Sequence, residues 1–171
     1  MLKSNAENME KEFLERLNQH RGIIYRISKV YMPDASERKD LVQEMVLQLW
    51  KSYATFKGDS SFSTWMYKVC LNTALTYVRG FLKHRDKHSE IRIDLAYEDE
   101  GKEEKEKINQ LYKIIYQLNE VDKALIFLYL EDMPGKDIAL SMGISEVNAR
   151  VKLNRIKEKI RQQFKNSGHE L

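Results

Sequence analysis

Side chains that can read nucleic acid gather on one side of a helical pattern near the C-terminal end of the chain. Apolar residues recur there every three or four positions: Ala149, Leu153, Ile156, Ile160 and Phe164. This spacing predicts a helix over residues 146–165 with one buried face. The other faces and the residue before the helix carry amides, cations, a hydroxyl and a valine: Ser145, Asn148, Arg150, Val151, Lys152, Asn154, Arg155 and Lys159. Amides and Arg bind base edges and cations bind phosphates, so we expect a recognition helix.

The residues before this helix complete a helix-turn-helix pattern. Residues 136–142 are typical of a short helix, Gly143 supplies a turn with positive φ, and Ser145 can cap the helix that follows. Residues 146–165 hold seven bases and two acids, a net charge of +5. A charged surface helix in a plain bundle is the competing interpretation. The turn, the cap and the charge together favour DNA binding.

A second set of polar side chains lies on the helical pattern of residues 63–79. That pattern is apolar on nearly every side, which is typical of a buried helix. One polar stripe remains, at Thr64, Lys68, Asn72 and Arg79. The stripe fits either a solvated edge or a surface for bases and phosphates. Just before it, residues 56–62 (FKGDSSF) form a Gly/Asp/Ser loop between two aromatic residues.

The predicted helix that follows Asp34 has a polar side interrupted by one leucine. Asp34 can cap this helix, with Glu37 three residues later in a capping-box arrangement. The apolar side holds Leu41, Val42, Met45, Val46 and Leu49, and the opposite side holds Asp40, Gln43, Glu44, Leu47 and Lys51. A single exposed leucine is ordinary. An apolar side chain within a polar stripe is also what a partner protein would bind, so both interpretations stay open.

The charge pattern divides the chain into two predicted domains. Residues 94–106 hold seven acids and two bases, a net charge of −5, with one glycine among them. A stretch of this composition buries too little apolar surface to fold alone. We expect helical domains at 10–85 and 105–166, joined by a flexible acidic linker at 86–104. Two Pro and seven Gly in 171 residues are few turn formers, so the predicted class is all-α.

Several classes of protein are disfavoured by the composition. One cysteine excludes an internal disulfide and a cysteine-built zinc site, and Cys70 is expected to be a core residue. The sequence has no Glu-x-x-His pair for a di-iron bundle, no Gly-rich phosphate loop and no Cys/His nucleophile pattern. His84 and His88, four apart, are a weak metal pair in a basic stretch. We predict no catalytic residue, metal, cofactor or small-molecule substrate. With no apolar run of about 20 residues and no apolar leader, we expect a cytoplasmic protein.

Three segments resemble the extracytoplasmic-function (ECF) group of bacterial sigma factors, within the sigma-70 family. They are residues 40–50 (DLVQEMVLQLW), 56–79 (FKGDSSFSTWMYKVCLNTALTYVR) and 132–161 (DMPGKDIALSMGISEVNARVKLNRIKEKIR). The resemblance covers about residues 10–165. It implies that region two fills the first domain and region four the second. It also implies an alternative sigma factor that binds core RNA polymerase, recognises a promoter and opens it.

The resemblance also implies roles for particular residues. Asp40, Gln43, Glu44 and Leu47 match the contact with the polymerase clamp helices, and the polymerase flap is a further expected partner. The −10 element is matched by Phe56, Lys57, Asp59, Ser60, Ser61, Phe62, Thr64, Lys68, Asn72 and Arg79. The recognition-helix residues given above match positions that face the −35 element. Val147 and Asn148 stand where the family often has Gly and Thr, which leaves the −35 sequence open.

Two further implications concern regulation and alternatives. Sigma factors of this group are commonly held inactive by an anti-sigma factor, often a membrane-bound one, and the resemblance implies such a partner here. The alternative function is a stand-alone helix-turn-helix transcriptional regulator with a helical sensor domain. Such a regulator would bind promoter DNA tightly without polymerase, whereas a sigma factor of this group would need it.

Overall fold

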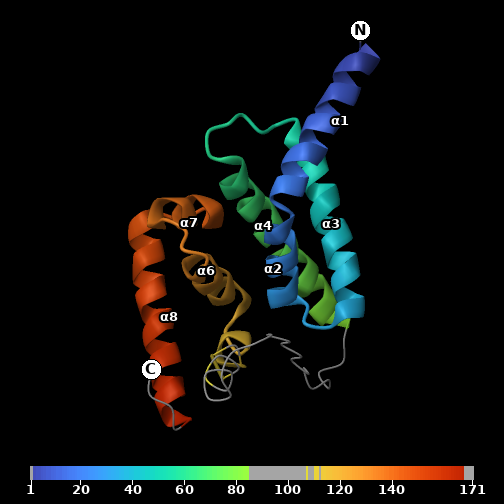
Figure 1. Cartoon of the computed structure of the whole chain (residues 1–171). Helices are drawn as coiled ribbons and strands as arrows, with labels where there is room; N and C mark the ends of the chain where they lie inside the picture. The colour runs from blue at the N-terminus through green and yellow to red at the C-terminus, as the bar shows by residue number, and fades with distance from the viewer. Residues whose placement is uncertain (1, 85–106, 108–109, 112, 168–171) are drawn as a thin grey trace. The chain divides into compact units, whose positions relative to one another are not determined.

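The computed structural model of the chain describes residues 2–84, 107, 110–111 and 113–167. These residues fall in two compact units divided between residues 90 and 91. Every regular element of the described residues is a helix (Figure 1). The predicted all-α class with two helical domains is therefore confirmed. The predicted linker, residues 86–104, lies outside the described residues.

The first unit contains four helices. They are α1 (Leu2–Gln19), α2 (Arg21–Tyr31), α3 (Ala35–Tyr53) and α4 (Phe62–His84). Helices α2, α3 and α4 pack against one another. Their shared core includes Ile27, Leu41, Met45, Leu49, Met66 and Leu71, all fully buried. Cys70 is buried in the same core, as predicted, and burial raises the pKa of its thiol to about 12.

Helix α3 begins at the cap that the sequence predicts. The Asp34 carboxylate accepts hydrogen bonds from the backbone N–H groups of Ser36, at 2.8 Å, and Glu37, at 3.1 Å. The Ser36 hydroxyl also donates to this carboxylate. These hydrogen bonds, that from the Ser36 hydroxyl foremost, lower the pKa of Asp34.

The second unit is built on α6 (Glu120–Leu130), α7 (Gly135–Met142) and α8 (Glu146–Asn166), which pack pairwise. A short helical stretch at 113–116 precedes them and buries Ile114 and Ile115. Six consecutive residues of α6, 123–128, are buried, because α6 packs against both α7 and α8.

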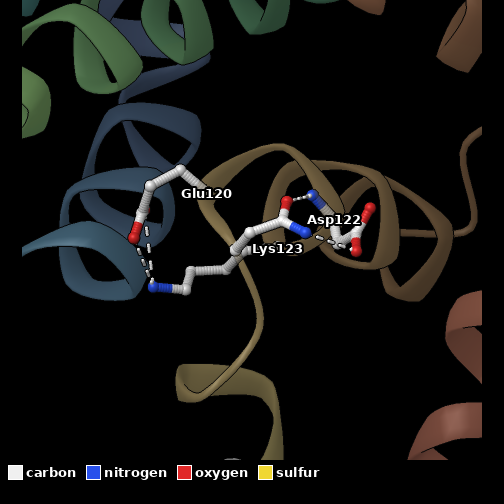
Figure 2. Close-up of polar contacts among 4 residues, drawn as sticks. Glu120, Asp122 and Lys123 are labelled. Atoms are coloured by element: carbon white, nitrogen blue, oxygen red, sulfur yellow. Dashed lines mark hydrogen bonds and ion pairs between the residues drawn. The ribbon is translucent and has the colours of Figure 1, made fainter.

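The first turn of α6 carries a polar cluster that the sequence did not reveal (Figure 2). The Asn119 side-chain oxygen accepts a hydrogen bond from the backbone N–H of Asp122 at 2.9 Å and thereby caps the helix. Lys123 is buried, and its Nζ lies 3.2 Å from Glu120 Oε1, one turn earlier. The ion pair offsets the desolvation of the ammonium group.

Candidate nucleic-acid and polymerase interfaces

An aromatic cluster holds both ends of the loop at 57–61. Phe56, just before the loop, and Phe62, just after it, have ring centroids 5.7 Å apart. Trp65 contacts both rings, with centroids 5.1 Å from Phe56 and 5.2 Å from Phe62. Phe62 is buried and Phe56 and Trp65 are half-buried. The cluster therefore fixes where the loop leaves and enters the fold, and the loop turns at Gly58, whose φ is 78°.

The polar side chains of this segment divide into those that cap α4 and those that remain accessible. Ser61 Oγ accepts a hydrogen bond from the backbone N–H of Thr64 at 3.1 Å and lies 2.8 Å from Thr64 Oγ1. Ser61 therefore caps the first turn of α4, and Thr64 is buried. Lys57 and Asp59 are exposed and Ser60 is half-buried. These three remain accessible to a ligand.

Arg16 of α1 and His20, which follows α1, also hold the loop through Phe62. The sequence analysis did not predict this contact. The Arg16 guanidinium carbon lies 5.6 Å from the centroid of Phe62, and the His20 ring meets Phe62 edge-on at 5.5 Å. The His20 Nδ1–H donates to the Arg16 carbonyl oxygen at 3.0 Å. Arg16 also pairs with Glu12 at 2.8 Å. Arg16 and His20 both precede Phe62 by more than forty positions, so no local pattern joins them.

The exposed stripe of α4 differs slightly from the predicted one. Lys68, Asn72 and Arg79 are exposed, as expected for a polar edge, whereas Thr64 is buried. Thr76 is exposed in its place, one turn after Asn72. The exposed part of the stripe therefore begins at Lys68.

The predicted polymerase face of α3 is exposed around Leu47. Asp40 and Gln43 are exposed, and Leu47 retains 43% of its accessible surface. Trp50, one turn later, retains 37% although its ring centroid lies 5.1 Å from that of Phe13. Sequence reasoning did not include Trp50 in this face. The exposed apolar area is thus larger than one leucine.

Glu44 lies at the edge of this face, toward α4. It is half-buried and accepts a hydrogen bond from Gln48 Nε2 at 2.8 Å. Together with Asn72 and Thr76 it lines a shallow groove between α3 and α4. The predicted polymerase face and the predicted −10 stripe therefore share a border at this groove.

The helix-turn-helix of the second unit has the predicted turn and cap. Gly143 ends α7 with φ 66°, and its backbone N–H bonds to the carbonyls of Ala139 and Leu140. Ser145 Oγ accepts from the backbone N–H of Asn148 at 3.2 Å and caps α8. Burial of the apolar face of α8, from Ala149 to Phe164, docks this helix on α6 and α7.

The outer face of α8 presents the predicted reading residues. Of the eight predicted contact residues, only Lys152 is half-buried. The seven exposed ones are Ser145, Asn148, Arg150, Val151, Asn154, Arg155 and Lys159. Val147 is also exposed, at 61% of its surface. Arg150 and Asn154 border a groove that includes Tyr129. The Nζ of Lys157 lies 4.7 Å from the Tyr129 ring centroid.

Comparison with known protein families matches both units. The Sigma-70 region 2 model matches residues 17–81, and the Sigma-70 region 4 model matches residues 108–160. The chain is 25% identical over 149 residues to RNA polymerase sigma factor SigV of Bacillus subtilis, which covers 86% of this chain and 88% of SigV. It is 25% identical over 118 residues to the ECF RNA polymerase sigma-E factor of Escherichia coli, covering 69% of this chain and 59% of that protein.

Two solved structures share the fold. The sigma factor RpoE of Bartonella quintana, solved with the anti-sigma factor NepR, has a TM-score of 0.74 at 15% identity and is matched over 98% of its length and 91% of this chain. CnrH, solved with the cytosolic domain of CnrY, has a TM-score of 0.65 at 14% identity, matched over 90% of its length and 92% of this chain. The two matched regions, with the exposed helix-turn-helix, define a DNA-binding protein of transcription initiation. The chain belongs to the sigma-70 family and to its ECF group.

As a member of this family, the chain is an alternative sigma factor that binds core RNA polymerase and directs promoter recognition and transcription initiation. The alternative of a stand-alone regulator is not favoured. In the described part of the chain, no helix is long and apolar enough to cross a bilayer, and no three His, Cys, Asp or Glu side chains gather as a metal site would require.

Proposed function

We propose that the two units divide promoter recognition between them. Asp40, Gln43, Glu44 and Leu47 of α3 bind the clamp helices of core polymerase. The loop at 57–61 and the exposed stripe of α4 bind the −10 element, and the outer face of α8 binds the −35 element. The observation that carries this assignment is the loop held at both ends by Phe56, Phe62 and Trp65, beside exposed polar groups on α4.

The proposed −10 mechanism uses binding energy to deform DNA. Taking a base out of the duplex stack costs a few kcal/mol. Stacking of a base on an aromatic ring returns about 1–3 kcal/mol, and Phe56 and Trp65 beside the loop are only half-buried. Because the ring cluster fixes the loop before DNA arrives, little of this energy is lost in ordering Lys57, Asp59 and Ser60.

Polymerase carries the chemistry of RNA synthesis, so we propose that this chain is a specificity subunit and not an enzyme. We also place it in the cytoplasm, where the polymerase acts. No cofactor enters this mechanism, because binding and base capture need only the side chains named above.

We further propose that an anti-sigma factor regulates the chain. The structurally similar RpoE was solved with the anti-sigma factor NepR, and CnrH was solved with the cytosolic domain of CnrY. An exposed apolar residue such as Leu47 and a charged outer face on α8 are surfaces that a protein inhibitor can cover. A membrane-bound inhibitor would place this sigma factor under control of an external signal.

The −10 assignment is tested by separating DNA binding from DNA opening. We expect Ser60→Ala with Asn72→Ala to leave closed-complex formation by the holoenzyme unchanged and to reduce permanganate-reactive thymines at the −10 element. Ser61 is left intact because it caps α4. Asn154→Ala on α8 is the matched control, and it should instead weaken the closed complex. Equal losses of binding and opening in the Ser60/Asn72 variant would contradict base capture.

A further inference from the structure

Helix α2 exposes a basic and aromatic surface that none of the roles above uses. The helix contains three bases and no acid. Arg21, Tyr25 and Arg26 are exposed, and Tyr25 retains 54% of its surface. Lys29 lies with its Nζ 5.7 Å from the Tyr25 ring centroid. We call Arg21, Tyr25, Arg26 and Lys29 the α2 surface.

Contacts at both ends tie this surface to the proposed −10 site. His20, the residue before α2, touches Phe62 at the end of the loop. Further along, Arg26 Nη2 donates to the Tyr67 hydroxyl of α4 at 3.2 Å. Lys68, the next residue of α4, opens the exposed stripe. The α2 surface therefore borders the loop and continues the positive charge of α4.

The other border of the stripe is unsuited to phosphate. Asn72 and Thr76 share the groove there with Glu44 of α3. Burial, followed by the charges of Asp40, Glu37 and Glu44, raises the pKa of Tyr77, which lines the same groove. A polyanion lying along α4 would meet carboxylates on the α3 side and cations on the α2 side.

We propose that the α2 surface binds the sugar–phosphate backbone of the promoter strand that leaves the −10 loop, with Arg21 and Lys29 contacting phosphates and Tyr25 stacking on a base or sugar. This inference rests on the proposed −10 role of the loop. Cations with an interleaved, exposed aromatic ring are the side chains that bind single-stranded nucleic acid without reading its sequence.

The test uses holoenzyme reconstituted from core polymerase and the full chain. Its promoter DNA is a sequence that the parent holoenzyme selects from a random library. From the −10 element onward the template strand is omitted, so that the non-template strand is single-stranded. One DNA ends at the −10 element and the other continues for about ten nucleotides. We expect the longer strand to raise the affinity of the parent, and Arg21→Gln with Lys29→Gln to remove most of that gain.

Salt dependence gives the expected size of the effect. Each phosphate contact to a single strand adds about 0.7 to the slope of log affinity against log salt. The variant lacks two such contacts, so its affinity for the longer strand depends less on salt. When salt rises from about 50 to about 200 mM, the affinity of the parent should fall about sevenfold more than that of the variant. Arg26 is kept because it bonds to Tyr67. Tyr25→Leu, which keeps both cations, should remove part of the gain and leave the slope unchanged.

Lys11→Gln with Lys165→Gln is the matched control, because it removes the same charge from exposed positions on α1 and α8. A variant at Arg21 and Lys29 that behaves like this control would overturn the inference. Loss of affinity for core polymerase, with the response to the longer strand intact, would also overturn it by making the α2 surface a protein contact. The Ser60/Asn72 variant is measured in parallel in the permanganate assay of promoter opening. If that variant opened the promoter as well as the parent does, the result would count against the proposed −10 role instead.

Discussion

Leu47 is the residue on which the polymerase assignment depends most. Its side chain lies on the same side of α3 as Asp40 and Gln43 and keeps 43% of its surface exposed. The sequence predicted the exposure of Leu47 because the helical angle places it opposite Leu41, Met45 and Leu49. It did not predict that Trp50 extends the same exposed area.

We expect Leu47→Asp to weaken binding to core polymerase at least tenfold while changing the free energy of unfolding by no more than about 0.5 kcal/mol, as is usual for surface positions. Fluorescence-detected titration with core polymerase measures the first quantity. Denaturant unfolding followed by Trp50 and Trp65, both in the first unit, measures the second. Leu14→Asp is the control, because Leu14 is similarly exposed, at 46%, on α1. Strong destabilisation by Leu47→Asp would show that Leu47 is a core residue.

Asp34 gives the first unit a pH-dependent cap. Because hydrogen bonds lower the folded-state pKa of Asp34, its contribution to stability is complete above the ordinary carboxyl pKa and is lost as the pH falls through the lowered value. We therefore expect Asp34→Ala to lower the Tm of the first unit at pH 7 and to lower it by less at pH 3, below the ordinary carboxyl pKa. Asp34→Asn retains a cap without a titrating group, so its Tm difference from Asp34→Ala should persist at both pH values. A Tm deficit of Asp34→Ala that is equal at both pH values would contradict this account.

At the scale of elements, the sequence predicted α3, α7 and α8 well because their periodicity and caps are local signals. Asp34, Gly143 and Ser145 each mark a helix end by their own chemistry. The burial of consecutive residues 123–128 in α6 depends on its packing against α7 and α8, which local periodicity does not report. The attachment of the loop through Arg16 and His20 was missed for the same reason, since it joins residues distant in the sequence.

The turn between α7 and α8 depends on Gly143. An added Cβ there would meet no atom within 4 Å, so the cost of Gly143→Ala comes from its φ of 66° alone. We expect Gly143→Ala to destabilise the second unit by about 1–2 kcal/mol and to weaken binding to −35 DNA. Gly135→Ala is the control, because Gly135 also has open space around it but no positive φ. Far-UV circular dichroism during unfolding measures the difference, and equal stability of the two variants would contradict a role for the turn.

At the scale of the whole molecule, the charge of the chain is segregated. Net charge is +3, yet residues 146–165 carry +5 and residues 94–106 carry −5. The acidic segment lies outside the described residues, and its sequence raises the question of whether it competes with DNA for α8. Exposed ion pairs are worth only about 0–1 kcal/mol each and weaken with salt. We therefore expect an external inhibitor to control the chain more strongly than this segment does.

Neutralising the acidic segment tests this ranking. A variant with Gln or Asn in place of Glu98, Asp99, Glu100, Glu103 and Glu104 should bind promoter DNA without polymerase no more than a few-fold more tightly than the parent at physiological salt. Filter binding or fluorescence anisotropy measures the affinity. A much larger gain would make self-inhibition the dominant effect and reverse the ranking.

The most direct test of the central claim is promoter opening by defined components. Core polymerase, the chain and the selected promoter are combined, and permanganate reactivity at the −10 element is measured with each component omitted in turn. We predict opening only when core polymerase and the chain are both present, with the Ser60/Asn72 variant binding the promoter but opening it less than the parent does. Tight promoter binding by the chain alone, with no opening when polymerase is added, would contradict the account and indicate a stand-alone regulator.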